Sequence, residues 1–148
     1  MPSTHVSLHY HLVWATKDHQ KSIHPAWKDR LHAWLGGCVR ELGGVAIAAG
    51  GVSDHVHCLA GLKATHRLSD FMRVLKSESS EWIHKELHVA TFQWQEGYGA
   101  FTVSPSQIKN VQKYILNQEE HHRSKTFQEE YVELLTRAGV EYDERYLW

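Results

Sequence analysis

The stretch VAIAAGGVSDHVHCLAGL, residues 45–62, decides the fold. Residues 45–52 and 55–62 are two apolar runs of strand length, and the polar pair Ser53 and Asp54 between them favours a turn. We therefore predict a β-hairpin whose two strands pair in antiparallel fashion. Every other element of the chain can be placed relative to this hairpin.

The second strand of this hairpin carries two histidines, His55 and His57. Residues two apart in a strand project to the same face, so the two imidazoles should lie side by side, as in half of a metal site. The chain has 13 histidines, so such a pair can also arise by chance. His9 and His11 repeat the spacing on another predicted strand, but they lack comparable partners downstream, and we interpret that second pair as structural.

Hydrophobic periodicity places the remaining elements around the hairpin. The first strand covers residues 5–16, and helices follow at 25–42 and 68–87. Short strands are expected at 91–94 and 100–103, and helices at 104–121 and 126–138; the last begins with a Thr126–Glu129 capping box and ends at Gly139. The order predicts one domain over residues 1–148. Its class is α+β, a ferredoxin-like split βαβ antiparallel sheet with helices on one face and a C-terminal helix in addition.

Composition restricts the functional class. The 148 residues contain no apolar run of about 18 and no basic-then-apolar leader, so we expect neither a membrane span nor a signal peptide. The two cysteines, Cys38 and Cys58, lack the spacing of metal ligands and suit a reducing cytoplasm. The formal net charge of −1 gives no overall attraction to polyanions, so a nucleic-acid binder would need a local basic patch.

The predicted helix at 104–121 offers two further candidate site residues. Tyr114 and Gln118 are four residues apart, so they lie roughly 40° apart on one helix face and bring a nucleophile next to a neutral oxygen ligand. Taken alone, Tyr114 is more typical of a hydrophobic core, and only its combination with the histidine pair favours a function. His121 and His122 are adjacent and point about 100° apart on a helix, which makes a poor chelate.

The combination resembles a known family. The matching segments are His55-Val56-His57, YILNQEEHH at 114–122, LVWATK at 12–17, GYGAF at 97–101 and YDERYLW at 142–148. Together they are similar to the single-tyrosine HUH transposases of the TnpA or IS200-like type, which move insertion sequences as single-stranded DNA. The likeness covers most of the chain.

The resemblance implies roles for particular residues. His55, His57 and Gln118 match the metal ligands of the family, and Tyr114 matches its nucleophile. It also implies a homodimer in which each active site takes its histidines from one chain and its tyrosine helix from the other. Recognition of hairpins at the element ends, and a cytoplasmic, nucleoid-associated location in a bacterium or archaeon, follow from the same resemblance.

The chemistry is consistent with these residue types. Two imidazoles and an amide leave a divalent ion its full charge, and nitrogen and oxygen ligands without thiolate favour Mg²⁺ or Mn²⁺, although zinc would also accept the histidines. Attack by Tyr114 on DNA would give a 5′-phosphotyrosine and a free 3′-OH. One phosphodiester replaces another, so rejoining needs no nucleotide cofactor, and the sequence has no phosphate-binding Gly-rich loop of the P-loop type.

Basic residues near the predicted site are candidates for phosphate contacts, which would make binding salt-dependent. They are Lys17, Arg73, Lys76, Lys109 and Lys113, with Lys63, Arg67 and Arg123 as further candidates. Two alternatives to a transposase stay open. One is a domesticated hairpin-DNA-binding protein without transposition activity, and the other is a small-phosphoester hydrolase, which would give Tyr114 no role.

Overall fold

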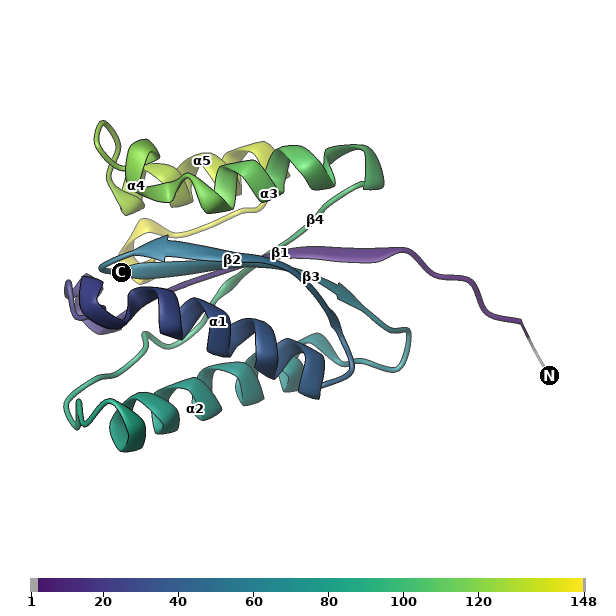
Figure 1. Ribbon diagram of the computed structural model, residues 1–148. Coiled ribbons are helices and arrows are strands. Elements are labelled where there is room, and N and C mark those ends of the chain that lie inside the picture. Colours follow the sequence, from purple (N-terminus) through teal and green to yellow (C-terminus); the bar gives the residue numbers. More distant parts are fainter. Residues whose placement is uncertain (1–2, 148) are drawn as a thin grey trace.

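The computed structural model describes residues 3–147, and its centre is a four-stranded antiparallel sheet (Figure 1). The strand order is β2-β3-β1-β4. The strands are β1 (Leu8–Ala15), β2 (Val45–Val52), β3 (His55–Leu62) and β4 (Gly99–Thr102). The predicted hairpin forms between β2 and β3, and β1 lies on the other side of β3.

Helices cover both faces of this sheet (Figure 1). The helices α1 (Pro25–Glu41) and α2 (Leu68–Glu86) pack on one face. The opposite face carries α3 (Ile108–Leu116), α4 (Gln118–His121) and α5 (Phe127–Ala138). The order β1-α1-β2-β3-α2-β4 confirms the predicted α+β, ferredoxin-like split βαβ fold, with the C-terminal helices as a separate layer.

Alternation along the central strands divides their side chains between the two layers. Leu12 and Trp14 of β1 join the main core under α1 and α2, together with Val56 of β3. Val13 lies between them in sequence and packs on the other face, in a second cluster with Phe127 of α5. Because Val13 pairs with His57 in register, the histidines of β3 also face the C-terminal helices.

Glycine at position 50 allows α3 to lie directly on strand β2. A Cβ atom at Gly50 would be 2.2 Å from the carbonyl oxygen of Ile115, which is closer than real Cβ atoms come to other atoms. Ile115 is itself fully buried beneath the helix. The close approach of backbone to backbone therefore fixes α3, and with it Tyr114, over the sheet.

Two predicted elements were wrong. Residues 91–94 do not form a strand: only Trp94 makes an isolated bridge, to Thr16, and this segment mainly contributes Phe92 to the core. The helix expected over 104–121 is divided into a 3₁₀ turn, α3 and α4. Ser104 does not cap it with its side chain, and Asn117 leaves helical geometry at φ −107° and ψ 27°. The Thr126 cap and the left-handed Gly139 end of α5 are as predicted.

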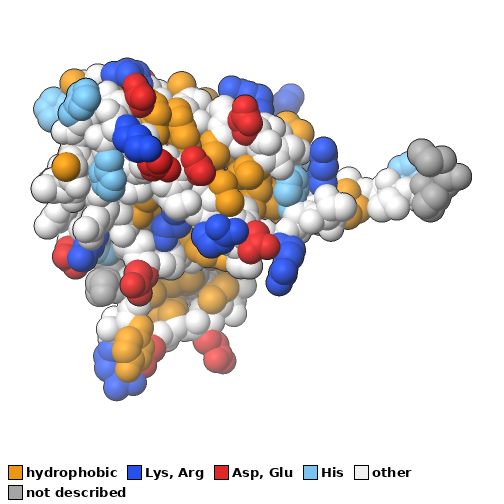
Figure 2. All heavy atoms as spheres, turned by 90° about the horizontal axis from the view of Figure 1, so that it is seen from below, with side chains coloured by type: hydrophobic (Ala, Val, Ile, Leu, Met, Phe, Trp, Pro, Cys, Tyr) orange, Lys and Arg blue, Asp and Glu red, His pale blue; other side chains and the backbone are white. Residues whose placement is uncertain are grey.

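The outer surface of the α1–α2 layer is mixed in character. Figure 2 shows basic and acidic side chains interspersed with hydrophobic ones on this face. Among residues 3–147, no helix is both long enough and apolar enough to cross a membrane. Trp148, the last residue of the YDERYLW segment, lies outside the described residues.

Candidate active site

His55 lies at the start of β3 with both ring nitrogens engaged. Its Nδ1 is 2.7 Å from Oδ1 of the neighbouring Asp54, so the Nδ1–H group donates to this carboxylate. Its Nε2 points to the C-terminal helices, 3.0 Å from Oε1 of Gln118 and 3.3 Å from Oε1 of Glu130. The ring stacks on Phe127, and the side chain is fully buried.

His57 lies next to His55 on the same face of β3, as predicted. Its Nε2 is 3.0 Å from Oε1 of Glu130. Its Nδ1 is 2.6 Å from Nε2 of His11, which belongs to β1, and the two rings stack with centroids 4.9 Å apart. His11 therefore positions the His57 ring, so one member of the pair that the sequence predicts to be structural contacts a predicted metal ligand.

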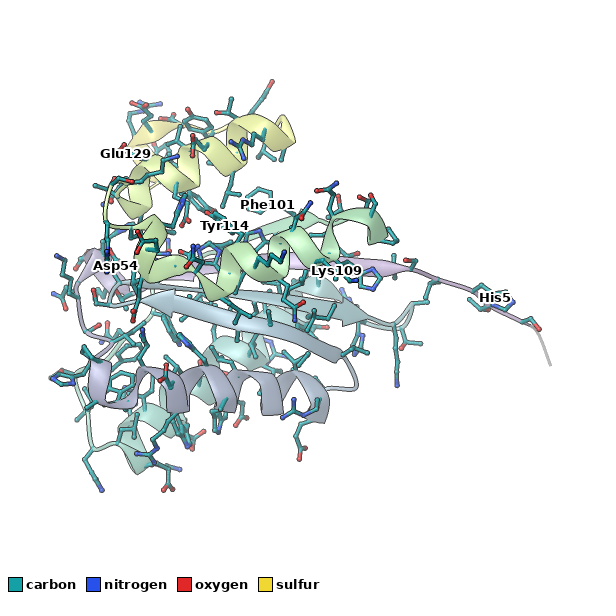
Figure 3. All side chains as sticks on the ribbon, turned by 45° about the horizontal axis from the view of Figure 1, so that its top comes forward. His5, Asp54, Phe101, Lys109, Tyr114 and Glu129 are labelled. Carbon is teal, nitrogen blue, oxygen red and sulfur yellow. The ribbon has the colours of Figure 1, made fainter. Side chains whose placement is uncertain are left out.

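Tyr114 projects from α3 into the same cluster. Its ring centroid is 5.7 Å from that of His57, at an edge-to-face angle of 89°. Its hydroxyl donates to Oε2 of Glu130 and lies 3.5 Å from Nε2 of His121. Figure 3 shows Tyr114 on α3, with Lys109 nearer the start of the same helix. Histidines and tyrosine thus meet within one chain.

The break at Asn117 positions Gln118. Its side-chain amide donates to the main-chain carbonyl of Tyr114 at 3.3 Å, which satisfies one of the free carbonyls at the end of α3. The opposite atom of the amide, Oε1, then faces His55. Gln118 is 1% exposed. Tyr114 and Gln118 therefore lie close together at a helix end, and not along a continuous helix face.

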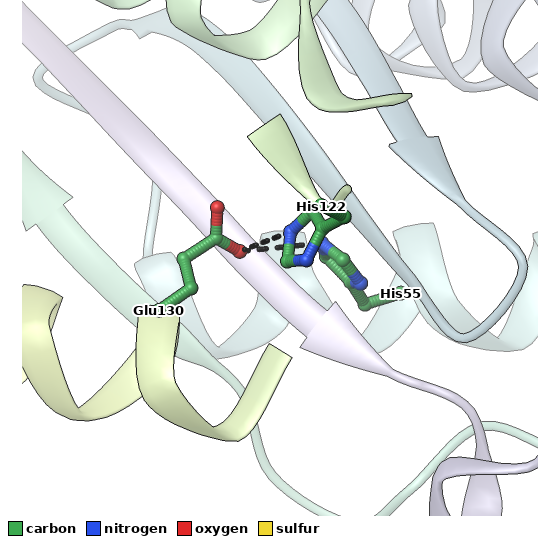
Figure 4. Close-up of side chains that lie close together, drawn as sticks. All are labelled: His55, His122 and Glu130. Carbon is green, nitrogen blue, oxygen red and sulfur yellow. Dashed lines mark ion pairs between the residues drawn. The ribbon is translucent and has the colours of Figure 1, made fainter. Parts of the chain in front are cut away.

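A buried cluster of possible metal ligands consists of His55, His122 and Glu130 (Figure 4). His122 donates from Nδ1 to the carbonyl of Lys125 at 2.7 Å. Its Nε2 is 3.0 Å from Oε1 of Gln118 and 3.2 Å from Oε1 of Glu130. The adjacent histidines 121 and 122 do not chelate together: His122 belongs to this cluster, whereas Nε2 of His121 lies 3.4 Å from the other carboxylate oxygen, Oε2 of Glu130.

Burial lowers the pKa values of His55, His57 and His11, and the neighbouring carboxylates raise them. For His55, burial lowers the pKa, but the carboxylates of Asp54 and Glu130 outweigh burial and raise it to about 9. Burial lowers the pKa of His57 to about 4 and that of His11 to about 3. The site therefore holds an imidazolium, His55, between two carboxylates, while His57 and His11 stay neutral.

The nucleophile candidate and the glutamate are held in opposite protonation states. Burial and the hydrogen bond to Glu130 raise the pKa of Tyr114, so its hydroxyl keeps its proton. Burial alone would raise the pKa of Glu130, but hydrogen bonds from His122, His55 and His57 hold it below its ordinary range. Glu130 is therefore a carboxylate that is 1% exposed and surrounded by donors.

These residues fit a divalent cation. An ion with bonds of about 2.1 Å at right angles holds neighbouring ligand atoms about 3.0 Å apart. The distances of 3.0 Å from His55 to Gln118 and 3.0 Å from His57 to Glu130 have this length. The Nδ1–H group of His55 donates to a carboxylate, which is the arrangement that directs the Nε2 lone pair of a metal-binding histidine to its ion.

A cleft of about 270 Å³ opens beside Tyr114. Its lining includes His11, His121 and Glu130 together with the cationic side chains of Lys125 and Arg137. A second groove, of about 550 Å³, runs past Gln118 and includes Lys28 and Arg123. Both grooves reach site residues from solvent, and each also contains carboxylates that pair with its cations, Glu133 with Lys125 and Glu119 with Lys28.

The predicted DNA-contacting residues are not gathered in one place. Lys109 and Lys113 are exposed on α3, near Tyr114, and Lys17 is exposed after β1. Arg73 and Lys76 lie on α2, across the sheet from Tyr114 (Figure 1). Lys76 donates to the carbonyls of Gln95 and Gly97, both at 2.7 Å, so it anchors a loop.

Three site residues escaped the sequence analysis: His11, His122 and Glu130. None of them belongs to the motif that identified the histidine pair. The available signals were weak: the second His-x-His pair for His11, and for Glu130 an inward-facing position in α5, three residues after Phe127. Strand pairing brings His11 to His57, and the packing of the C-terminal helices on the sheet brings His122 and Glu130 to His55.

The chain thus combines an α+β sheet, a buried histidine pair on its central hairpin and a tyrosine on a covering helix. The family model of IS200-like transposases matches residues 4–118. The chain therefore belongs to the IS200-like transposase family, as the resemblance implied.

Individual relatives agree with this assignment. The ISDra2 transposase TnpA of Deinococcus radiodurans is 28% identical over 117 residues, which cover 75% of this chain and 84% of the relative. The crystal structure of a candidate transposase from Deinococcus radiodurans R1 aligns with a TM-score of 0.64 at 28% identity and covers 80% of this chain and 95% of the other. A REP-associated tyrosine transposase bound to a REP hairpin shares the fold: its TM-score is 0.56 at 12% identity, over 78% of this chain and 68% of the other.

Proposed function

We propose that this protein is a single-strand DNA transposase that cuts and rejoins DNA through Tyr114. The observation that carries the proposal is the contact between the Tyr114 and His57 rings, because it brings a nucleophile to a histidine pair suited to a cation. Membership of the IS200-like transposase family supports it. The relative bound to a REP hairpin supports hairpin DNA as the partner.

The proposed reaction begins with the proton of Tyr114. Its hydroxyl donates to Oε2 of Glu130, which is therefore the nearest acceptor when the phenol loses its proton. A free tyrosine has a pKa of about 10, so an acceptor in contact with the hydroxyl is needed at neutral pH. The phenolate oxygen then attacks the scissile phosphorus, the bond from phosphorus to the 3′-oxygen breaks, and a 5′-phosphotyrosine forms. The departing 3′-oxygen takes up a proton and becomes the free 3′-OH.

His55, His57 and Gln118 would hold Mg²⁺ or Mn²⁺ at this place. Once bound, a divalent ion polarises and orients a phosphate as a Lewis acid. The protein residues orient the site: Asp54 fixes the ring of His55, and His11 fixes that of His57. Lys109 and Lys113 on α3, with Lys17 beyond them, would neutralise phosphates of the bound strand.

A covalent adduct tests the proposal. The protein is incubated with MnCl₂ or MgCl₂ and labelled single-stranded oligonucleotides that carry the ends of its own element, and denaturing gels report a protein–DNA adduct. Tyr114→Phe should abolish the adduct while hairpin binding, measured by gel shift, persists. Wild-type protein that binds hairpins without forming an adduct would indicate the domesticated binding protein. A phosphatase activity that survives Tyr114→Phe would indicate the hydrolase.

We also propose a homodimer with shared active sites, working in the cytoplasm near the nucleoid. Tyr114 packs beside His57 of its own chain in this structure, so sharing requires α3 to exchange between two chains. Mixing Tyr114→Phe with His57→Ala protein tests this point. If sites are shared, mixed dimers regain one intact site and the adduct returns; if each site uses one chain, the mixture stays inactive.

A further inference from the structure

Three histidine side chains point their Nε2 atoms at one carboxylate oxygen, Oε1 of Glu130. Oε1 of Glu130 is 3.3 Å from Nε2 of His55, 3.0 Å from Nε2 of His57 and 3.2 Å from Nε2 of His122. Gln118 Oε1 lies 3.0 Å from His55 Nε2 and 3.0 Å from His122 Nε2. Two oxygens are thus surrounded by ring nitrogens that reach them from a strand and from the α4–α5 segment.

In both His55 and His122, the Nδ1–H group donates a hydrogen bond on the side of the ring away from the cluster. When such a ring is neutral, its Nε2 atom therefore carries a lone pair. His55 uses its Nδ1–H for Asp54, and His122 uses its Nδ1–H for the carbonyl of Lys125. Each neutral ring then turns a bare Nε2 towards oxygens that are also acceptors. Lone pairs that face one another in a buried site require a cation between them, either a proton or a metal ion.

We propose that Glu130, through Oε1, and His122, through Nε2, bind the divalent cation together with His55. The inference rests on the metal dependence of the proposed function and enlarges its ligand set. Both residues lie beyond residue 118, where the match to the family model ends. Within residues 3–147, the donor atoms of His55, His122 and Glu130 also all lie within 4.8 Å of one another.

The added ligands change the chemistry of the site. Glu130 contributes the negative charge that the neutral set of two imidazoles and an amide lacks, and carboxylates are preferred ligands of hard divalent cations. His122 adds an imidazole, which favours Mn²⁺ or Zn²⁺ over Mg²⁺. The other carboxylate oxygen, Oε2, accepts from Tyr114, so one side chain connects the cation to the nucleophile.

The direct test is a titration of the protein with Mn²⁺ in the absence of DNA. Electron paramagnetic resonance measures the concentration of the free ion, and this gives the dissociation constant. Glu130→Gln and His122→Gln should each weaken binding by about tenfold or more, because each removes a ligand. Glu120→Gln and His5→Gln are the matched controls: both side chains are exposed, and both variants should bind Mn²⁺ as the wild type does. Circular dichroism in EDTA shows whether each variant is folded.

A second measurement needs no variant. Pulsed electron paramagnetic resonance of Mn²⁺ on the wild-type protein counts coordinated imidazole nitrogens. Three imidazoles support His122 as a ligand beside His55 and His57, whereas two would restrict the ion to the strand pair and overturn that part of the proposal. This readout holds even if a substitution at Glu130 or His122 prevents folding.

The sign of the Glu130→Gln effect separates this proposal from its rival. Tighter Mn²⁺ binding in the variant would show that Glu130 occupies the place of the ion and competes with it, and unchanged binding would show no contact; either result overturns the proposal. Failure of the proposed function looks different: no adduct forms at Tyr114, although Mn²⁺ binds and depends on Glu130.

Discussion

At the scale of single residues, the site depends on where protons lie. His55 is charged because Asp54 and Glu130 lie on either side of it, whereas His57 and His11 are neutral because they are buried next to each other. Histidines with identical chemistry thus differ in pKa from about 9 to about 3 within one cluster. Neutral rings have lone pairs for a cation, and the charged ring would have to release its proton first.

These shifts predict a stability maximum near pH 6.5 for the metal-free protein. Because the pKa of His55 is raised to about 9, its contribution is complete below its unfolded pKa and is lost as the pH rises towards 9. His57, His11 and His32 have pKa values lowered to about 4, about 3 and about 4, so the unfolded chain takes up more protons and stability falls as the pH drops below 6.5.

Urea unfolding of EDTA-treated protein between pH 4.5 and 9.5 measures this profile. The free energy of unfolding should decline on both sides of its maximum, and His55→Gln should remove most of the decline on the alkaline side. A free energy that continues to rise up to pH 9 would contradict the raised pKa of His55.

At the scale of elements, the placement of α3 decides whether a site exists. The helix lies on β2 at Gly50, and the chain then breaks at Asn117 so that Gln118 faces His55. Helix α5 brings Glu130 from the other side. The periodicity predicted a continuous helix through residue 121. Such a helix would lack the bend at Asn117 that turns the side chain of Gln118 towards His55.

Gly50→Ala tests the docking of α3. The added Cβ would lie 2.2 Å from the carbonyl oxygen of Ile115, so α3 must shift away from the sheet. We expect a loss of about 1–3 kcal/mol in the free energy of unfolding, together with weaker Mn²⁺ binding. Thermal and urea unfolding measure the first, and Mn²⁺ titration the second.

Gly37→Ala is the matched control for this substitution. Gly37 lies inside α1, and the nearest atom to an added Cβ is a flexible Arg40 nitrogen at 3.9 Å. Alanine is the better helix former, so this variant should gain about 0.5–1 kcal/mol. Equal effects of the two substitutions would show that Gly50 has no special role in seating α3.

At the scale of the whole molecule, the site joins the two ends of the chain. His11 comes from the first strand, His55 and His57 come from the central hairpin, and Tyr114 and Glu130 come from the C-terminal layer. A cation bound there would bridge the sheet and the helices above it. Binding to the folded state alone raises the stability of the whole protein.

Metal addition should therefore raise the melting temperature. At a free Mn²⁺ concentration about 100 times the dissociation constant, the folded state gains about 2.7 kcal/mol. Differential scanning calorimetry in MnCl₂ and in EDTA measures the shift, and Glu130→Gln should reduce it. The same melting temperature in both buffers would argue against a cation at this site.

The sequence by itself determined the sheet and the histidine pair. Strands and helices follow from local periodicity, and the spacing of His55 and His57 places both rings on one face of β3 whatever surrounds them. The motif at Tyr114 and Gln118 was also visible, since a spacing of four residues brings side chains together in any helix.

Only the tertiary structure decided which other residues complete the site. His11 reaches His57 through strand pairing across 46 residues, and Glu130 reaches it across 73. The first contact depends on the pairing of β1 with β3 and the second on how α5 packs on the sheet, and no local pattern of the chain encodes either geometry. The break at Asn117 likewise accompanies contacts of Gln118 with the carbonyl of Tyr114 at the end of α3 and with His55 on a distant strand. Hydrophobic periodicity does not report such contacts.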